Sequence, residues 1–375
     1  MYLLRIVLLA LATVTAVAAD GLPGEMTLEA LPQTVPAPFN NVGSPAKVAL
    51  GRLLFFDPVL SATKTVACAT CHYPAMGWSD GRAVPIGAGG EGIGRQRKVV
   101  ASAALPLLHR NTPSLLNVAF NGMVSGTAYD PANAPMFWDS RAAGLEAQAL
   151  VPLRSREEMR GDVCAEAEAL PFAMERVMAV MEYRERFAKV FFGPVTSVKL
   201  AMALAAFERT LVSCNTRFDR FMRGDKGAMD EQQQRGMKVF REAGCMHCHG
   251  GPMFSDFKPH VIGVSDAIGI GRRGFRTPTL RNLKHSAPYM HNGTMKSLDD
   301  VLAFYEQLGD AASESLDGAD QSAQPPLDPF LQKLNLRPED FPALRAFFDA
   351  LDDDGYDQRV PARVPSGLPV AGGRP

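Results

Sequence analysis

The sequence lacks the features that mark nucleic-acid-binding and membrane-spanning proteins. Its 375 residues carry 39 Lys and Arg against 40 Asp and Glu, a formal net charge of -1, and no Lys- or Arg-rich run stands out. Such a chain presents no basic surface to a polyanion, so we expect no nucleic-acid partner. Beyond the N-terminus no apolar run is long enough to cross a bilayer, so we expect no membrane span. Alternating apolar and polar runs are also scarce, which favours a mostly helical fold.

The N-terminus has the features of an export signal. "MYLLR" is a short basic start, "IVLLALATVTAVA" is too short to span a bilayer comfortably, and Ala16-Val17-Ala18 offers a small-residue cleavage site. The alternative is an uncleaved anchor, which the length of the run disfavours. We therefore expect residues 1–19 to be a signal peptide and the mature protein to be a soluble protein of the periplasm.

Cysteine is scarce, and four of the six cysteines fall in two short motifs. "CATCH" contains Cys68 and Cys71, and "CMHCH" contains Cys245 and Cys248. In an oxidising compartment a bare C-x-x-C tends to close as a disulfide, and a zinc site would need both pairs together. A histidine directly after the second cysteine is instead the attachment signature of c-type haem.

The spacing of these motifs has a physical reason. Residues at i and i+3 share one side of a helical turn, so both sulfurs of a motif can reach the two vinyl groups of one porphyrin. The next residue, His72 or His249, then offers its imidazole to the iron. We expect two covalently bound haem c groups. Cys164 and Cys214 remain, and the sequence leaves open whether they pair or stay free.

The pattern of apolar residues predicts helices around both motifs. The predicted helices lie at 47–56, 139–153 (beginning at Asp139), within 165–223, before the second motif at 230–244, at 298–308 with Ser297 as N-cap, and at 338–351. We expect a mostly α fold of two cytochrome c-like helical domains, each with one covalent haem. The expected boundaries are 20–220 and 221–355, followed by an extended tail at 356–375.

Further motifs occur in a fixed order between about 50 and 295: "LGRLLFFDPVLS", "RNTPSLLN", "FWDSRAAGLEAQALVP", "FDRFMRGD" and "TPTLRNLKHSAPYMHNGT". Together with the two haem motifs they resemble those of the bacterial dihaem cytochrome c peroxidase/MauG superfamily. The resemblance covers nearly all of the mature chain. It implies that His72 is the proximal ligand of a peroxide-reacting haem and that His249 is the proximal ligand of an electron-relay haem.

The same resemblance implies roles for residues around the first haem. Trp138 matches a tryptophan that lies between the haems and can pass an electron or hole; the alternative is a plain core aromatic. Gln148 and Glu158 match a polar pair above the peroxide-reacting iron. Glu158 is the better catalyst because a carboxylate in a partly apolar pocket can move a proton between peroxide oxygens; the alternative is a solvated glutamate. Pro152 matches a pocket-lining proline.

The distal ligands distinguish the branches of the superfamily. At the first haem, the position of the distal histidine found in many relatives corresponds to Ala103, which implies a five-coordinate iron. At the second haem the resemblance places Tyr305 where cytochrome c peroxidases have methionine and MauG-like proteins have tyrosine. A phenolate is an anion that favours Fe(III) and higher states, whereas a thioether favours the reduced iron. Met290 and Met295 are the rival ligands, and His109, His260, His285 and His291 are expected to be hydrogen-bonding or surface residues.

A calcium ion is also implied by the resemblance. Asn111, Ser286 and Pro288 match the calcium site between the domains, although the superfamily more often has threonine at the position of Ser286. A backbone carbonyl ligand would not be affected by that change. Hard cations take six or more oxygens, so water must complete such a site.

Three functions follow from these residues. The first is a MauG-like enzyme that uses hydrogen peroxide to form a high-valent state shared by both haems and oxidises a residue on a partner protein. The second is a dihaem cytochrome c peroxidase that reduces peroxide with electrons from a small cytochrome or cupredoxin. The third is an electron carrier without catalysis. Such a carrier would need a sixth ligand at both irons, and the sequence offers no obvious sixth ligand at the first.

Overall fold

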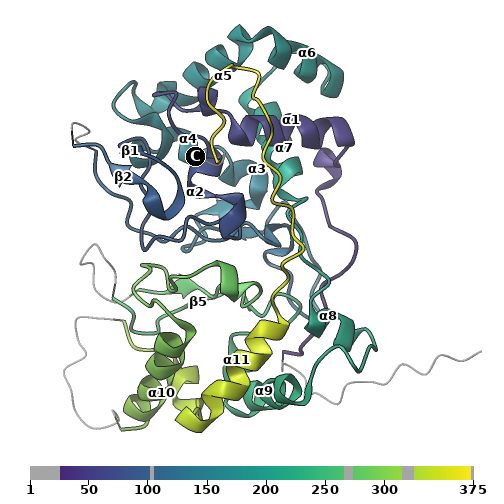
Figure 1. Ribbon diagram of the computed structural model, residues 1–375, viewed down its shortest axis with the longest axis vertical. Helices are drawn as coiled ribbons and strands as arrows, with labels where there is room; N and C mark the ends of the chain where they lie inside the picture. Colours follow the sequence, from purple (N-terminus) through teal and green to yellow (C-terminus); the bar gives the residue numbers. More distant parts are fainter. Residues whose placement is uncertain (1–25, 102–104, 266–272, 315–324, 373–375) are drawn as a thin grey trace, which may run out of the picture.

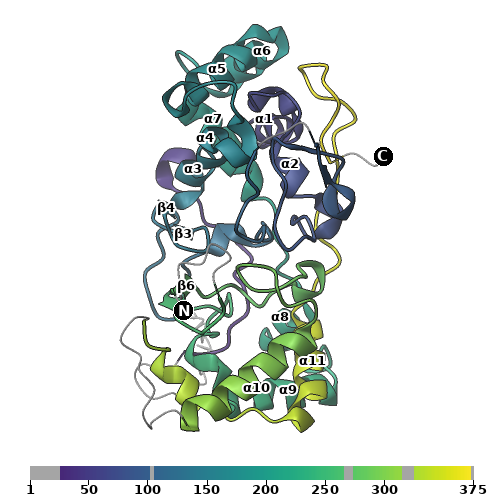
Figure 2. The same cartoon turned by 90° about the vertical axis from the view of Figure 1, so that its left-hand side faces the viewer.

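Two helical lobes form the molecule. The computed structural model describes residues 26–101, 105–265, 273–314 and 325–372, so the predicted signal peptide at 1–19 and Ala103 lie outside the described residues. The lobes are stacked along the long axis, with loops between them (Figures 1 and 2). The prediction of a mostly helical fold is confirmed. In the described parts of the chain, no helix is long and apolar enough to pass through a bilayer.

Among the described residues, helices account for most of the regular structure, and the strands form three short antiparallel pairs. The helices are α1 (Pro45–Phe56), α2 (Cys68–Cys71), α3 (Gly144–Gln148), α4 (Val151–Arg154), α5 (Ala169–Ala179), α6 (Met181–Val190), α7 (Ser197–Glu208), α8 (Arg217–Met222), α9 (Glu231–Glu242), α10 (Leu298–Glu314) and α11 (Phe341–Ala350). The pairs are β1 (Gly90–Glu91) with β2 (Lys98–Val99), β3 (Pro135–Met136) with β4 (Ala142–Ala143), and β5 (Pro259–His260) with β6 (Phe275–Arg276).

The first lobe is built on the crossing of α1 and α7. Ser44 caps α1 by accepting a hydrogen bond from the backbone N–H of Lys47, and Pro45 opens the helix. The backbones then touch at Gly51, where a Cβ atom would lie 1.9 Å from the Ala203 carbonyl oxygen and 2.9 Å from Cβ of Phe207. Only glycine allows this approach.

The second lobe repeats this crossing with α9 and α11. Asp230 and Gln233 form a capping box at the start of α9. A Cβ atom on Gly236 would lie 1.9 Å from the Ala343 carbonyl oxygen and 2.8 Å from Cβ of Phe347. In both lobes a glycine on one helix therefore faces an alanine and, one turn later, a phenylalanine on the other.

The first described residues pack against the second lobe, and the last described residues pack against the first lobe. Leu28, near the N-terminus, belongs to the core of the second lobe, and the backbone N–H of Leu31 donates to Asp219 there. The C-terminal arm, which we define as residues 356–372, leaves α11 and runs back along the first lobe (yellow in Figure 1). Tyr356 and Val364 of the arm are buried in the core of the first lobe.

The predicted helix over 139–153 is wrong at its N-terminal end. The chain reverses direction here because Phe137 and Ser140 have φ of 67° and 55°, in the left-handed region that helices do not use. The guanidinium of Arg141 packs 3.7 Å from the centre of the Phe137 ring and stabilises this turn. Regular helix begins only at Gly144.

We expect Gly51→Ala and Gly236→Ala to destabilise the protein. A glycine-to-alanine change within a helix ordinarily stabilises by about 1 kcal/mol, but here the new methyl group must separate two helix backbones, and such overpacking costs about 1–3 kcal/mol. Thermal unfolding of the variants should therefore show lower midpoints. Gly43→Ala is the control, because no atom lies within 4 Å of its added Cβ. Unchanged midpoints for both helix variants would contradict the close crossing.

Candidate functional site

A cavity of about 700 Å³ lies between the two lobes and takes side chains from both. It contains both C-x-x-C-H motifs. The predicted site residues that line it are Cys68, Cys71, His72, Cys245, Cys248, His249, Trp138, Gln148, Pro152, Glu158, Tyr305, Asn111, Ser286 and Pro288. Residues that are far apart in the sequence are thus brought to one continuous space.

The first motif forms one helical turn that presents a neutral imidazole. Cys68 and Cys71 begin and end α2, and His72 is its C-cap. The Nδ1–H of His72 donates to the Trp78 carbonyl oxygen at 2.9 Å, which leaves Nε2 as the available ligand atom. Burial lowers the pKa of His72 to about 4, so the ring is uncharged at neutral pH.

The second motif repeats this arrangement. The Nδ1–H of His249 donates to the Phe254 carbonyl oxygen at 2.9 Å, and burial lowers the pKa of His249. Trp78 and Phe254 are both buried, with φ of 59° and 52°. Non-glycine residues are rare in this left-handed region, and bulky ones are held there by their surroundings. The same hydrogen bond therefore orients both imidazoles.

The cysteines fit covalent haem attachment. All six lie among the described residues, and none is disulfide-bonded, including Cys164 and Cys214. Burial raises the pKa of the Cys71 and Cys245 thiols to about 12, so they are neutral. Each motif thus offers two free thiols and one neutral imidazole to a large cavity, a donor set that suits haem c.

Glu158 enters the cavity from a short irregular turn. Residues Arg156–Arg160 form one turn of π-helix, whose cap Ser155 accepts a hydrogen bond from the Glu158 N–H. Gly87 packs against this turn: a Cβ atom there would lie 2.6 Å from the Cα atom of Glu158. Burial is the main cause that raises the pKa of Glu158 to about 7, against the opposing charge of Arg141. This carboxyl can therefore take up or release a proton near neutral pH.

Gln148 and Pro152 also line the cavity. Gln148 ends α3, and Pro152 is the second residue of α4. A proline is tolerated in the first turn of a helix but not later. The single helix predicted over 139–153 is therefore also wrong at its centre, because the chain breaks between Gln148 and Val151 and begins a new helix with Pro152 in its first turn.

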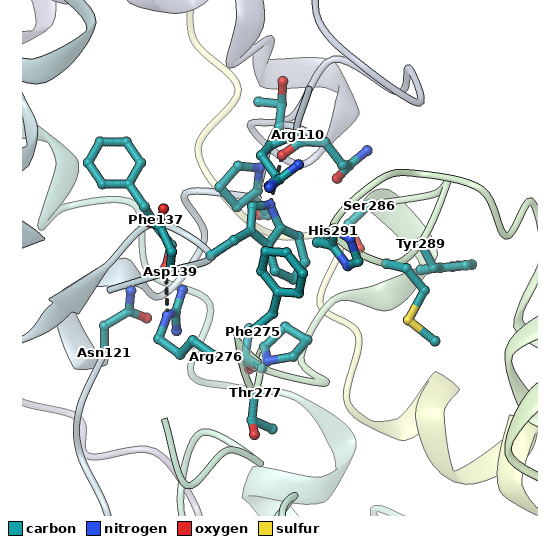
Figure 3. Close-up of a pocket in the computed structure, with 18 of the residues that line it drawn as sticks. Arg110, Asn121, Phe137, Asp139, Phe275, Arg276, Thr277, Ser286, Tyr289 and His291 are labelled. Atoms are coloured by element: carbon teal, nitrogen blue, oxygen red, sulfur yellow. Dashed lines mark hydrogen bonds between the residues drawn. The ribbon is translucent and has the colours of Figure 1, made fainter. Parts of the chain in front are cut away.

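Trp138 lies at the junction of the lobes and is held by both. Its indole N–H donates to the Asn111 carbonyl oxygen at 2.9 Å, and its own carbonyl accepts from the backbone N–H of Arg276 at 2.7 Å. The Arg276 side chain in turn donates through Nε to the Phe137 carbonyl (Figure 3). Arg276 is buried, and burial lowers its pKa to about 10.

Tyr305 projects from α10 into the part of the cavity around the second motif. Tyr305 lines the cavity together with Cys245, Cys248 and His249 of the second motif. Burial raises the pKa of Tyr305, so the side chain alone is a neutral phenol. A strong Lewis acid could deprotonate it, because a bound metal ion inverts the usual effect of burial.

The rival methionines lie in the turn around His291. Met290 lines the cavity next to His291, whose ring stacks 3.7 Å from that of Phe275. The guanidinium of Arg110 lies 5.0 Å from the Phe275 ring centre (Figure 3). Met295 pairs through its carbonyl with the Tyr289 N–H at 2.7 Å. Both methionines therefore belong to the turn around His291, whose carbonyl accepts a hydrogen bond from Asn111 at the lobe junction.

The proposed calcium ligands come from both lobes. The backbone N–H of Asn111 donates to the His291 carbonyl at 2.7 Å, and its side-chain amide donates to the Arg82 carbonyl at 2.7 Å. Ser286 donates to Leu283 across 3.4 Å. Asn111 therefore joins the lobes, and through its carbonyl it also holds Trp138.

Of the remaining histidines, His260 has the strongest contacts. Its Nε2 lies 2.8 Å from Asp256 and its Nδ1 2.5 Å from Asp328, and the hydrogen bond with Asp256 is the main cause that raises the pKa of His260. This agrees with a hydrogen-bonding role. His109 lines the cavity but is exposed.

No role was assigned to Trp78 from the sequence. Its carbonyl orients His72, as that of Phe254 orients His249. A comparison of the two halves could have revealed this, because "WSD" at 78–80 and "FSD" at 254–256 follow the motifs at nearly the same distance. The serines also correspond: Ser79 donates to Thr112 at 2.8 Å and Ser255 to Thr277 at 2.7 Å.

Comparisons with known proteins agree with this site. The family model for di-haem cytochrome c peroxidase matches residues 45–227. The methylamine utilization protein MauG of Methylorubrum extorquens is 37% identical over 294 residues, 74% of this chain and 74% of that protein. The cytochrome-c peroxidase IdrP1 of a Pseudomonas species is 31% identical over 388 residues, 90% of this chain and 88% of that protein.

A solved structure shows the same fold over most of the chain. It is that of a MauG-like protein associated with microbial copper homeostasis, with a TM-score of 0.66 and 26% identity over 86% of this chain and 95% of that one. Together with the sequence relatives and the paired motifs, this establishes the family. The chain belongs to the di-haem cytochrome c peroxidase family, which includes the MauG proteins, and is a peroxide-dependent haem oxidoreductase.

Proposed function

We propose that this enzyme is MauG-like: it uses hydrogen peroxide to oxidise the haem pair and then oxidises a residue on a partner protein. The observation that carries the proposal is the position of Tyr305 on α10, where it lines the same cavity as Cys245, Cys248 and His249 of the second motif. A tyrosine ligand favours oxidised iron, as storage of oxidising equivalents requires. Relatives named MauG and relatives named cytochrome-c peroxidase both match, so the alternative is a peroxidase supplied with electrons by a small redox protein.

The haems would supply the redox chemistry, and the residues of the cavity would control protons and position. Cys68, Cys71 and His72 would hold the peroxide-reacting haem, with Glu158 and Gln148 on the cavity wall. As a carboxylate, Glu158 would accept a proton from peroxide and return it to the departing oxygen. Gln148 has both a donor and an acceptor, and it would orient the peroxide.

Electron transfer between the two haem sites would pass through Trp138. The indole is fixed by Asn111 of the first lobe, and its backbone is fixed by Arg276 of the second. A calcium ion held by Asn111, Ser286 and Pro288 would stiffen the same junction. We also propose that the mature protein, without residues 1–19, works in the periplasm, where its partner protein would be found.

Two haems should be covalently bound. Because each motif supplies its own pair of thiols, Cys68→Ala with Cys71→Ala should lose one haem, and Cys245→Ala with Cys248→Ala should lose the other. Mass spectrometry of the denatured protein measures this directly. The matched control, Cys164→Ala with Cys214→Ala, should keep both haems. A wild-type mass with one haem or none would refute the proposed function.

The reaction with peroxide should depend on the protonation of Glu158. With its pKa at about 7, the carboxylate form grows as pH rises through neutrality, so the rate should rise over the same range. Glu158→Gln should slow the reaction by about 10²–10⁴-fold and flatten this pH dependence. Stopped-flow absorbance at several pH values measures both effects. Glu157→Gln, which makes the same change one residue away, should retain most of the rate; equal losses in the two variants would remove Glu158 from the reaction.

Tyr305 should decide between the two functions. In the wild type the fully ferric protein should react with peroxide without prior reduction, because an anionic ligand holds the second haem at low potential. Tyr305→Met should raise that potential and make the reaction depend on prior reduction, whereas Tyr305→Phe should only remove the oxygen ligand. Redox titration followed by absorption spectra compares the three proteins. A wild-type protein with a methionine-ligated haem that is inert to peroxide until half-reduced would favour the peroxidase alternative.

A further inference from the structure

The last described residues of the C-terminal arm contact the region of the first haem motif. Ala371 N–H donates to the Phe56 carbonyl at 3.1 Å. A Cβ atom on Gly372 would lie 3.2 Å from Cβ of Ala69, the residue that follows Cys68. Figure 1 shows the arm following the first lobe from α11 to the region of α2. Gly372 of the arm is therefore packed directly on the haem-attachment turn.

The start of the arm holds the segment that follows the motif. The hydroxyl of Tyr356 accepts a hydrogen bond from the backbone N–H of Gly77 at 3.1 Å. The carbonyl of Asp357 accepts from the indole N–H of Trp78 at 2.9 Å. Asp357 itself is fixed by ion pairs with Arg52 and Arg359. Two adjacent residues of the arm thus accept hydrogen bonds from Gly77 and Trp78, two adjacent residues of the segment that follows the motif.

Trp78 connects these contacts to the imidazole of His72. The Trp78 carbonyl accepts the Nδ1–H of His72, and Trp78 is a buried residue in the left-handed region. A bulky residue keeps such a conformation only where its neighbours hold it. Aromatic rings of the helix pair enclose one side, with Phe55 and Phe207 at 5.6 and 5.7 Å between ring centres. The arm holds the indole N–H.

The second lobe lacks this connection. Phe254 occupies the place of Trp78, with the same conformation and the same bond from His249. Its ring packs on Phe218, Phe240 and Phe347, but a phenyl ring has no N–H to donate. The two halves therefore share the histidine–carbonyl bond, and only the first adds a hydrogen bond from the ring to the arm.

We propose that the C-terminal arm is a positioning element for His72, acting through Asp357, Tyr356 and Trp78. The inference rests on the proposed role of His72 as proximal ligand of the peroxide-reacting haem. A hydrogen bond from the second nitrogen of a ligating imidazole fixes the ring orientation and raises its basicity. By fixing the Trp78 carbonyl, the arm keeps this bond short and the His72 ligand electron-rich.

The test uses the full-length dihaem protein with Trp78→Phe and Tyr356→Phe. Trp78→Phe keeps an aromatic ring but removes the donor to Asp357, and Tyr356→Phe removes only the acceptor for Gly77. We expect the iron–histidine stretching frequency of the reduced first haem to fall and its redox potential to rise, with the second haem unchanged. The reaction with peroxide should slow by about 10–100-fold in Trp78→Phe and by less in Tyr356→Phe.

The control is Arg363→Ala, a change in the arm away from the haem motif. Arg363 is exposed and pairs with Glu182 on α6 at 2.7 Å, so its loss should leave both haems as in the wild type. If Trp78→Phe fails to fold, Tyr356→Phe decides by the same spectra. Wild-type frequency and potential in the folded variants, or equal shifts at both haems, would overturn the role of the arm. A wild-type protein without a five-coordinate, histidine-ligated haem would instead contradict the proposed function before any variant is compared.

Discussion

One hydrogen bond in each lobe links the fold to the chemistry: Nδ1–H of the motif histidine donates to the carbonyl of Trp78 or Phe254. That carbonyl can point at the imidazole only because its residue has a left-handed conformation. The aromatic ring of that residue is held by the helix pair, whose crossing depends on Gly51 or Gly236. A contact between two helix backbones therefore determines, through one aromatic ring, the direction in which each imidazole faces.

The two lobes share this framework and differ in what surrounds it. Around the first motif, the turn after α4 brings a carboxyl with a pKa of about 7 to the cavity. Around the second motif, α10 brings a phenol. Trp138 lies between them, and both lobes hold it in place. The repeated scaffold thus gives two similar binding sites, and the loops and helix faces around them give each site its own chemistry.

The parts of the molecule that could be predicted from the sequence are those that short spacings determine. The haem motifs, the capped helix before the second motif, and the helix carrying Tyr305 follow from local patterns. The turn at Phe137 and Ser140 was missed because its left-handed residues are not glycines. The role of Trp78 was missed because it depends on contacts with Asp357 and with the helix pair, and no local pattern specifies contacts at such a separation.

The docking of the arm also bears on the order in which this protein can fold. The bond between Trp78 and Asp357 joins residues 279 positions apart, and that between Arg52 and Arg359 joins residues 307 apart. A ribosome makes Asp357 after both haem motifs and nearly all the helices, so the first lobe cannot complete its core during synthesis. Contacts between residues so far apart in the sequence form slowly. The chain must lose the conformational entropy of a long closed loop before these contacts stabilise the fold. The paired helices of the second lobe lie within one stretch of chain, and its distant partners Leu28 and Leu31 are made before it. The second lobe can therefore finish first although its helices are made later.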